Sequence, residues 1–178
     1  MPGLSPISEA FIVHWGEMGL RWGINRTVAQ IHALLYLSPK PMDADSIAET
    51  LGVARSHVGN SLKELQGWGI VKMVHVMGER RDHYESLKDV WEMFQIILDE
   101  RRKREIDPTI GTLRHLSKVA GRVGSAEHYN YERLSEMLRF FETMTNWYST
   151  IRGMGTGSVM KMVRMGDKIR KVLGIGAT

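Results

Sequence analysis

The chain has 178 residues, of which 43% are hydrophobic and 25% charged, so it can bury a core of ordinary size. Its net charge of +4 mildly favours binding to polyanions. The absence of cysteine excludes disulfides and thiol-based redox chemistry. Because neither a signal-peptide pattern nor an apolar run of the ~18 residues needed to cross a bilayer occurs, we expect a cytoplasmic protein without stable membrane association.

The first predicted helix covers residues 7–22, where apolar side chains recur at helical spacing: Ile7, Phe11, Trp15 and Met18. Gly23 is expected to end it. A second helix should begin at Asn25 or Thr27 and run through Leu37, because Ser38-Pro39 stops a helix.

The next stretch predicts a short helix from Asp43 or Asp45 to Gly52, followed after a turn by a second helix. The second of these buries Val58, Leu62 and Leu65 on one face. Its opposite face is small, polar and cationic, with these side chains: Arg55, Ser56, His57, Asn60 and Lys63.

That polar face has the chemistry of a DNA-reading surface. Asn60 can pair with adenine through two hydrogen bonds, while Ser56 and Lys63 can contact bases or phosphates. Arg55 at the start of the helix is better placed for phosphate, and His57 can do either. The alternative is an ordinary solvated helix face.

A hairpin follows, with a strand over residues 70–77, a cationic turn over 78–82 and a returning strand from His83. Arg80 and Arg81 lie at its tip, where arginines can enter a narrow minor groove, and Arg81 is the better candidate. The alternative is that Glu79 and Asp82 neutralise both arginines. Helix, turn, helix and hairpin together predict a winged helix-turn-helix.

Beyond Leu87 the pattern predicts a helix to Glu105 that Asp107-Pro108 breaks, a short helix over 108–119 and a turn over 121–125. The cationic run 101–104 can contact flanking DNA, pair with acidic residues of a partner subunit, or form a solvated helix end. A long helix over 126–152, a glycine-rich hinge and a basic helix over 158–173 complete the chain.

The long helix carries two apolar stripes, more than one small domain can cover, which predicts a homodimer. The side chains expected at the dimer contact are Phe11, Phe140, Phe141, Trp147 and Ile151. The expected fold class is therefore mainly α with a small β-hairpin wing, a winged helix-turn-helix with flanking dimerisation helices. We divide it into an N-terminal dimerisation helix (7–22), a DNA-binding domain (23–87) and a C-terminal dimerisation and possible effector region (88–178).

Several spaced motifs resemble the GbsR branch of the MarR-like transcriptional regulators. They are GLRWGINR at 19–26, IHALLYLS at 31–38, IAETLGV at 47–53, NSLKEL at 60–65 with WGIV at 68–71, and GERRDHYE at 78–85. The resemblance covers about residues 10–95 and implies a homodimeric repressor with its reading helix at 54–68 and its wing at 73–86. Two positions depart from the pattern, since many relatives have Ser where Ala54 stands and Asp where Glu79 stands.

The resemblance also implies control of osmoprotectant uptake or synthesis, with choline or glycine betaine as possible effector. A cage for such a quaternary ammonium group needs aromatic faces, for which the candidates are Trp15, Trp22, Tyr36 and Trp91, with Trp147 and Tyr148 further along. The alternative for all of them is core or dimer packing.

No metal-ligand spacing, cofactor loop or nucleophile–base pair is recognisable, so we expect no metal, no cofactor and no enzyme. The glycines at 153, 155 and 157 follow a helix rather than a strand, which favours a hinge over a phosphate loop. The leading hypothesis is a sequence-specific, double-stranded-DNA-binding repressor released by a small ligand or ionic signal. The alternative is a winged-helix protein-interaction module without sequence-specific DNA binding.

Overall fold

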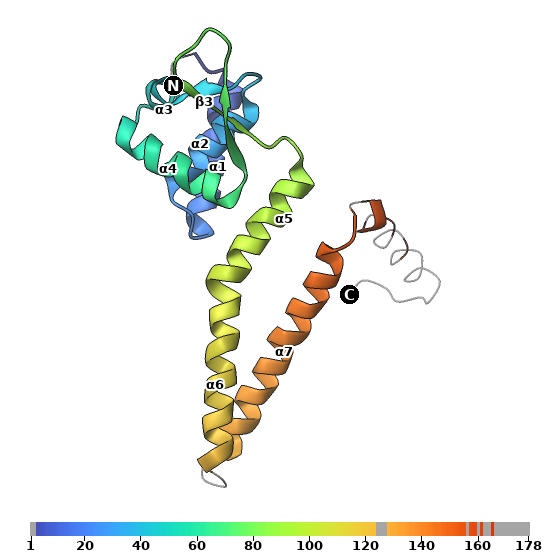
Figure 1. Cartoon of the computed structure of the whole chain (residues 1–178). Coiled ribbons are helices and arrows are strands. Elements are labelled where there is room, and N and C mark those ends of the chain that lie inside the picture. The colour runs from blue at the N-terminus through green and yellow to red at the C-terminus, as the bar shows by residue number, and fades with distance from the viewer. Residues whose placement is uncertain (1–2, 124–127, 156, 160, 162–164, 166–178) are drawn as a thin grey trace. The chain divides into compact units, whose positions relative to one another are not determined.

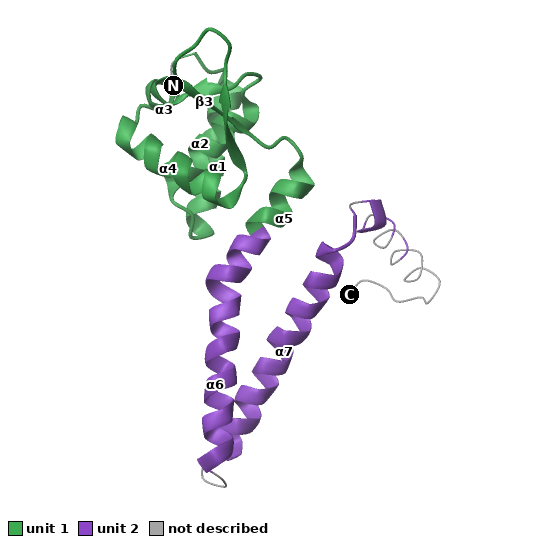
Figure 2. Ribbon diagram, viewed as in Figure 1, with its two compact units in different colours: residues 1–97 green, residues 98–178 purple. Residues whose placement is uncertain are grey.

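The computed structural model describes residues 3–123, 128–155, 157–159, 161 and 165. The chain forms two compact units, unit 1 (residues 1–97) and unit 2 (residues 98–178), shown in Figure 2. None of the described helices is both long enough and apolar enough to cross a membrane.

Four helices of unit 1 lie where the sequence predicts them: α1 (Pro6–Arg21), α2 (Arg26–Leu37), α3 (Ala44–Leu51) and α4 (Arg55–Trp68), as Figure 1 shows. The predicted start signals are confirmed, since Asn25 Oδ1 accepts the Thr27 N–H at 2.8 Å and Asp43 Oδ1 accepts the Asp45 N–H at 2.9 Å. Gly52 ends α3 in the left-handed region, with φ 66°.

The sheet has three antiparallel strands in the order β1-β3-β2: β1 (Met42–Asp43), β2 (Val71–His75) and β3 (Asp82–Ser86). The hairpin β2–β3 is the predicted wing, with Val74 opposite His83. Strand β1 was not predicted, because two residues are too short to show an alternating pattern. The fold is therefore mainly helical with a small hairpin wing, and it confirms the winged helix-turn-helix.

The core of unit 1 lies between α1, α2, α3, α4 and the start of the wing. Its completely buried side chains come from each of these elements: Ile12, Ile31, Leu35, Ile47, Val58, Leu62, Leu65 and Ile70. Three of them belong to α4, so packing fixes which face of that helix is left to solvent.

Unit 2 corrects the expectation that Asp107-Pro108 breaks the chain. After α5 (Val90–Arg101) a π-helical turn, η1 (Arg102–Ile106), leads directly into α6 (Asp107–Val123). The Asp107 N–H donates to the Arg102 carbonyl, five residues back. This widened turn accommodates Pro108, whose ring would collide with a carbonyl in a regular α-helix.

Helices α6 and α7 (His128–Arg152) lie side by side (Figure 1), and Arg114 joins them through a 2.6 Å ion pair with Glu142. Gly121 was expected in a turn but lies within α6. A side chain there would meet the ring of Tyr131 at 3.2 Å, so this glycine allows α7 to approach closely. Residues 124–127 and most of the basic helix expected over 158–173 lie outside the described residues.

Candidate nucleic-acid interface

Helix α4 presents the predicted polar face to solvent. Val58, Leu62 and Leu65 are buried, whereas every predicted contact residue on the other face is exposed: Arg55, Ser56, His57, Asn60 and Lys63. The face therefore offers amide, hydroxyl, imidazole and ammonium groups on a helix that the core holds rigidly.

The start of α4 lacks a side-chain cap, as expected from the alanine at position 54. Ala54 has extended backbone angles, φ −63° and ψ 140°, and no side-chain hydrogen bond caps the helix. The N–H groups of the first turn are therefore not satisfied by a capping side chain, and such groups favour an anion such as a phosphate.

The tip of the wing is shaped by Gly78 and by a buried histidine that the sequence did not single out. Gly78 adopts φ 85° in the turn. His83 is buried, with Nδ1 3.0 Å from the Arg81 carbonyl oxygen and Nε2 3.1 Å from the Glu79 carboxylate. This histidine therefore holds the part of the tip between Glu79 and Arg81 against β3, while the side chains of Arg80 and Arg81 are exposed.

Two acidic residues at the start of α3 join the wing to helix α4. Arg81 Nη1 lies 3.4 Å from Asp43 and 3.3 Å from Asp45, and Arg55 Nε lies 2.8 Å from Asp45. Arg81 is therefore neutralised, but not by Glu79 and Asp82 as the alternative proposed.

These ion pairs are suited to exchange for phosphate. The Arg81 and Arg55 side chains are more than half exposed, so each pair contributes at most about 1 kcal/mol. Burial would raise the pKa of Asp43, but hydrogen bonds from Ser46 and the Asp45 N–H outweigh it and lower the pKa to about 2. Asp43 thus remains charged and keeps the Arg81 guanidinium at the start of α3.

The aromatic residues predicted to form one cage are distributed over different surroundings. Trp15 and Trp22 line an apolar pocket of about 220 Å³ in unit 1, whereas Tyr36 and Trp91 are not among its lining residues. The Tyr36 ring already has the Lys88 ammonium 5.7 Å from its centroid. Trp147 and Tyr148 belong to unit 2, so they are no part of this pocket.

Lys88 also holds the end of α2. Its ammonium donates to the carbonyls of Leu35, Tyr36 and Ser38 at 2.9, 2.7 and 2.9 Å. These are carbonyls that a helix end leaves without partners. Partial burial lowers the pKa of Lys88.

The residues predicted for dimer contact differ in exposure within the single chain. Phe140 and Trp147 are 60% and 59% exposed, while Phe141 and Ile151 are half-buried. Phe11 stacks on Trp15 with ring centroids 5.3 Å apart, so part of its surface already packs inside unit 1.

The cationic run 101–104 pairs within its own segment. Arg101 lies 3.6 Å from Glu105, Lys103 2.7 Å from Glu100, and Arg102 3.8 Å from Asp107. In the described residues no group of three or more His, Asp or Glu side chains could hold a metal ion.

Comparison with known proteins agrees with the fold. No family model matches the chain. The chain is 26% identical over 86 residues to "Putative HTH-type transcriptional regulator YvaV" of Bacillus subtilis (strain 168), covering 48% of this chain and 49% of that protein. It is 25% identical over 73 residues to "HTH-type transcriptional repressor OpcR" of the same organism, covering 41% of this chain and 40% of that protein.

The matches thus span half or less of these relatives. Among solved structures, "Crystal Structure of a transcriptional regulator" is similar with a TM-score of 0.57 and 20% identity, covering 83% of this chain and 97% of that one. The structural likeness supports the fold. Both sequence relatives are named as regulators and neither as an enzyme, in agreement with the prediction that this protein is not an enzyme.

Proposed function

We propose that the protein is a cytoplasmic, sequence-specific DNA-binding transcriptional regulator that acts as a homodimeric repressor. The observation that carries the proposal is a shared acidic partner: Arg81 of the wing pairs with Asp43 and Asp45, and Arg55, the first residue of α4, pairs with the same Asp45. A helix that enters the major groove and a wing that reaches the adjacent groove need this arrangement. The names of the sequence relatives support the same class of function.

In this mechanism Asn60 and Lys63 contact base edges, and Arg55 and Arg81 exchange their carboxylate partners for phosphate or minor-groove contacts. The carboxylates preorganise the arginines in the free protein. Because phosphate contacts release counterions from DNA, the affinity should fall steeply with salt.

The homodimer is proposed from unit 2. Phe140 and Trp147 are exposed aromatic side chains on α7, and such residues are enriched in protein interfaces. Two subunits would place two reading helices at half-sites about one DNA turn apart. Sedimentation equilibrium tests this: we expect a dimer whose dissociation constant rises at least tenfold in Trp147→Ala. The matched control is His115→Ala, an exposed aromatic position on α6.

Release by a small ligand is the regulatory part of the proposal. The resemblance of residues 10–95 to the GbsR branch favours osmoprotectant control, with choline and glycine betaine as candidate effectors. Calorimetric titration of each into the pure protein tests them, and no heat at millimolar concentration would exclude both.

DNA binding is tested with a fluorescent duplex from the region upstream of the protein's own gene, by anisotropy at about 50 and about 200 mM salt. We expect saturable binding that weakens at least a hundredfold over this range, and a marked loss of affinity in Asn60→Ala but not in the matched control Asn146→Ala on α7. No binding at the lower salt concentration would favour the protein-interaction module instead. That alternative is worth testing, because residues 1–90 carry nine Lys and Arg against ten Asp and Glu.

A further inference from the structure

The tip of the wing carries an apolar side chain that the DNA contacts proposed above do not use. Between β2 and β3 the Val76 carbonyl accepts the Glu79 N–H at 3.1 Å, and Gly78 has φ 85°. A glycine with positive φ at the third position of such a turn is the pattern of a type II β-turn. Met77 therefore occupies the second position, at the corner of the turn.

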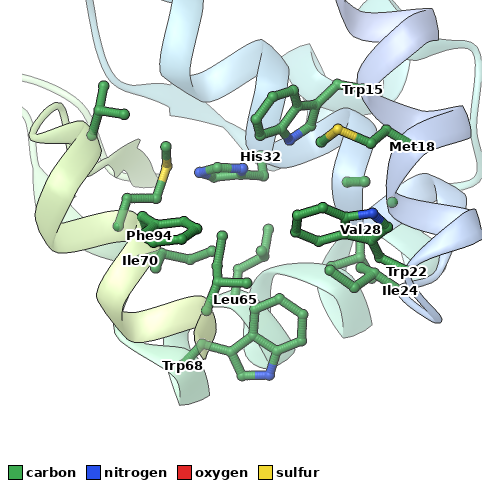
Figure 3. Close-up of a pocket in the computed structure, with 15 residues that line it drawn as sticks. Trp15, Met18, Trp22, Ile24, Val28, His32, Leu65, Trp68, Ile70 and Phe94 are labelled. Atoms are coloured by element: carbon green, nitrogen blue, oxygen red, sulfur yellow. The ribbon is translucent and has the colours of Figure 1, made fainter. Parts of the chain in front are cut away.

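Met77 packs against none of the described residues. Its exposed fraction is 101%, the highest among the large apolar side chains that the structure describes. By contrast, Trp22 and Phe94 are each 43% exposed and face a common pocket of unit 1, where other apolar side chains cover part of their surface (Figure 3). Met77 thus contributes no burial to the folded protein, and its whole apolar surface is free to be covered by a partner.

The charges around Met77 favour a polyanion as that partner. Arg80 is exposed and forms no ion pair with a described residue. The Arg81 side chain is also more than half exposed, although it pairs with the acidic residues of α3. The Glu79 carboxylate is held 3.1 Å from the buried His83 Nε2. The tip therefore presents an apolar corner flanked by two guanidinium groups.

The DNA minor groove offers a partner for both kinds of group. Where the groove is narrow, its negative potential attracts arginine. Proteins that bind there also insert apolar side chains, methionine among them, between base pairs, which unstacks one step and kinks the duplex. Methionine suits this contact because it is long, unbranched and adaptable in shape. Pyrimidine–purine steps such as TA unstack most readily, so the contact selects a sequence without a hydrogen bond to a base.

We propose that Met77 is an apolar wedge that enters the minor groove beside each half-site, opens one pyrimidine–purine step and bends the duplex. The two arginines hold the wing in the groove, and Met77 adds a preference for deformable DNA to the base contacts of Asn60. This inference rests on the proposed DNA-binding function and goes beyond it, because that function uses the arginines of the wing and needs no apolar contact.

The test compares wild type with two variants of the same position. Met77→Gln keeps the length of the side chain but makes its end polar, and the matched control Met77→Leu keeps it apolar. Each protein is added at saturating concentration to a duplex that wild type enriches from a random pool, labelled at both ends for fluorescence energy transfer. Wild type and Met77→Leu should bring the two ends closer together, whereas Met77→Gln should bind with the ends nearly as far apart as in free DNA. All three proteins should have the same melting temperature, because Met77 has no packing to lose.

The selection itself gives a second measurement. Wild type should enrich a pyrimidine–purine step beside each half-site, and Met77→Gln should lose this preference about tenfold while it keeps the adenine preference assigned to Asn60. The inference is overturned if wild type binds without bending the duplex, if Met77→Gln bends it as wild type does, if Met77→Leu fails to bend it, or if wild type and Met77→Gln enrich the step equally. In each of these outcomes the protein still binds DNA and the proposed function stands, whereas a wild type that binds no duplex refutes both.

Discussion

The neutral state of His32 makes the stability of unit 1 dependent on pH. In the unfolded chain this histidine has a pKa of 6.5, and in the folded protein burial, reinforced by Lys88, lowers the pKa to about 4. Above pH 6.5 both states are neutral and folding carries no penalty from this group. As the pH falls from 6.5 toward 4, the unfolded chain gains a proton that the folded protein excludes, so stability is lost over this range.

The size of this effect follows from the two pKa values. Between about pH 7.5 and about pH 4.5, the free energy of unfolding should fall by roughly 2.5 kcal/mol on account of His32 alone. Leucine removes both the titration and the buried Nε2, which has no hydrogen-bond partner among the described residues. We therefore expect the free energy of unfolding of His32→Leu, relative to that of wild type, to be about 2.5 kcal/mol more favourable at the lower pH than at the higher pH.

The assay is urea unfolding followed by circular dichroism at both pH values, for wild type, His32→Leu and His14→Leu. The exposed His14 serves as the control, because its replacement should leave the pH dependence of wild type intact. A difference between His32→Leu and wild type that is the same at both pH values, within about 0.5 kcal/mol, would refute the assignment of a buried neutral histidine.

Two further predictions concern helix stability and are checked by thermal unfolding. Ala54→Ser supplies the missing cap of α4, so we expect about 1 kcal/mol of stabilisation; an unchanged melting temperature would show that the cap position is already satisfied. Gly19→Ala should destabilise by about 1–3 kcal/mol, because the new methyl group would lie 2.6 Å from Ala29 Cβ on α2. Gly16→Ala is the matched change on the same helix. Its methyl group would lie 2.7 Å from Gln30 Cγ and 3.2 Å from Arg26 Cγ, which can move by side-chain rotation, whereas Ala29 Cβ cannot. We therefore expect a smaller loss at Gly16 than at Gly19, and equal losses at both glycines would contradict this account.

Much of unit 1 could be predicted from local signals. Asn25 and Asp43 are capping residues and act as caps, and the spacing of Val58, Leu62 and Leu65 correctly gave the buried face of α4. These signals depend on neighbours in sequence, which is why they can be read without coordinates.

The errors arose where the outcome does not follow from the local sequence pattern. Pro108 normally ends a helix, but the π-helical turn before it absorbs the ring, and no local pattern announces such a turn. Gly121 was taken for a turn because its reason for being small, the ring of Tyr131, belongs to another helix.

The candidate site shows the same division. The exposed face of α4 followed from periodicity, whereas the partners of Arg81 did not, because Asp43 is 38 residues away in the sequence. Nor did the sequence single out the buried His83, which contacts Glu79 and the Arg81 carbonyl in the wing tip. These contacts depend on the sheet, in which β1 pairs with β3 and Asp43 lies opposite His83.

Selection of bound duplexes from a random pool tests the central claim most directly, since it asks what the exposed face of α4 reads. We expect wild type to enrich a two-fold symmetric sequence with half-sites about 10 base pairs apart, and Asn60→Ala to lose its preference at one adenine of each half-site. Enrichment of no sequence, or of the same sequence with equal preference by wild type and Asn60→Ala, would contradict the account.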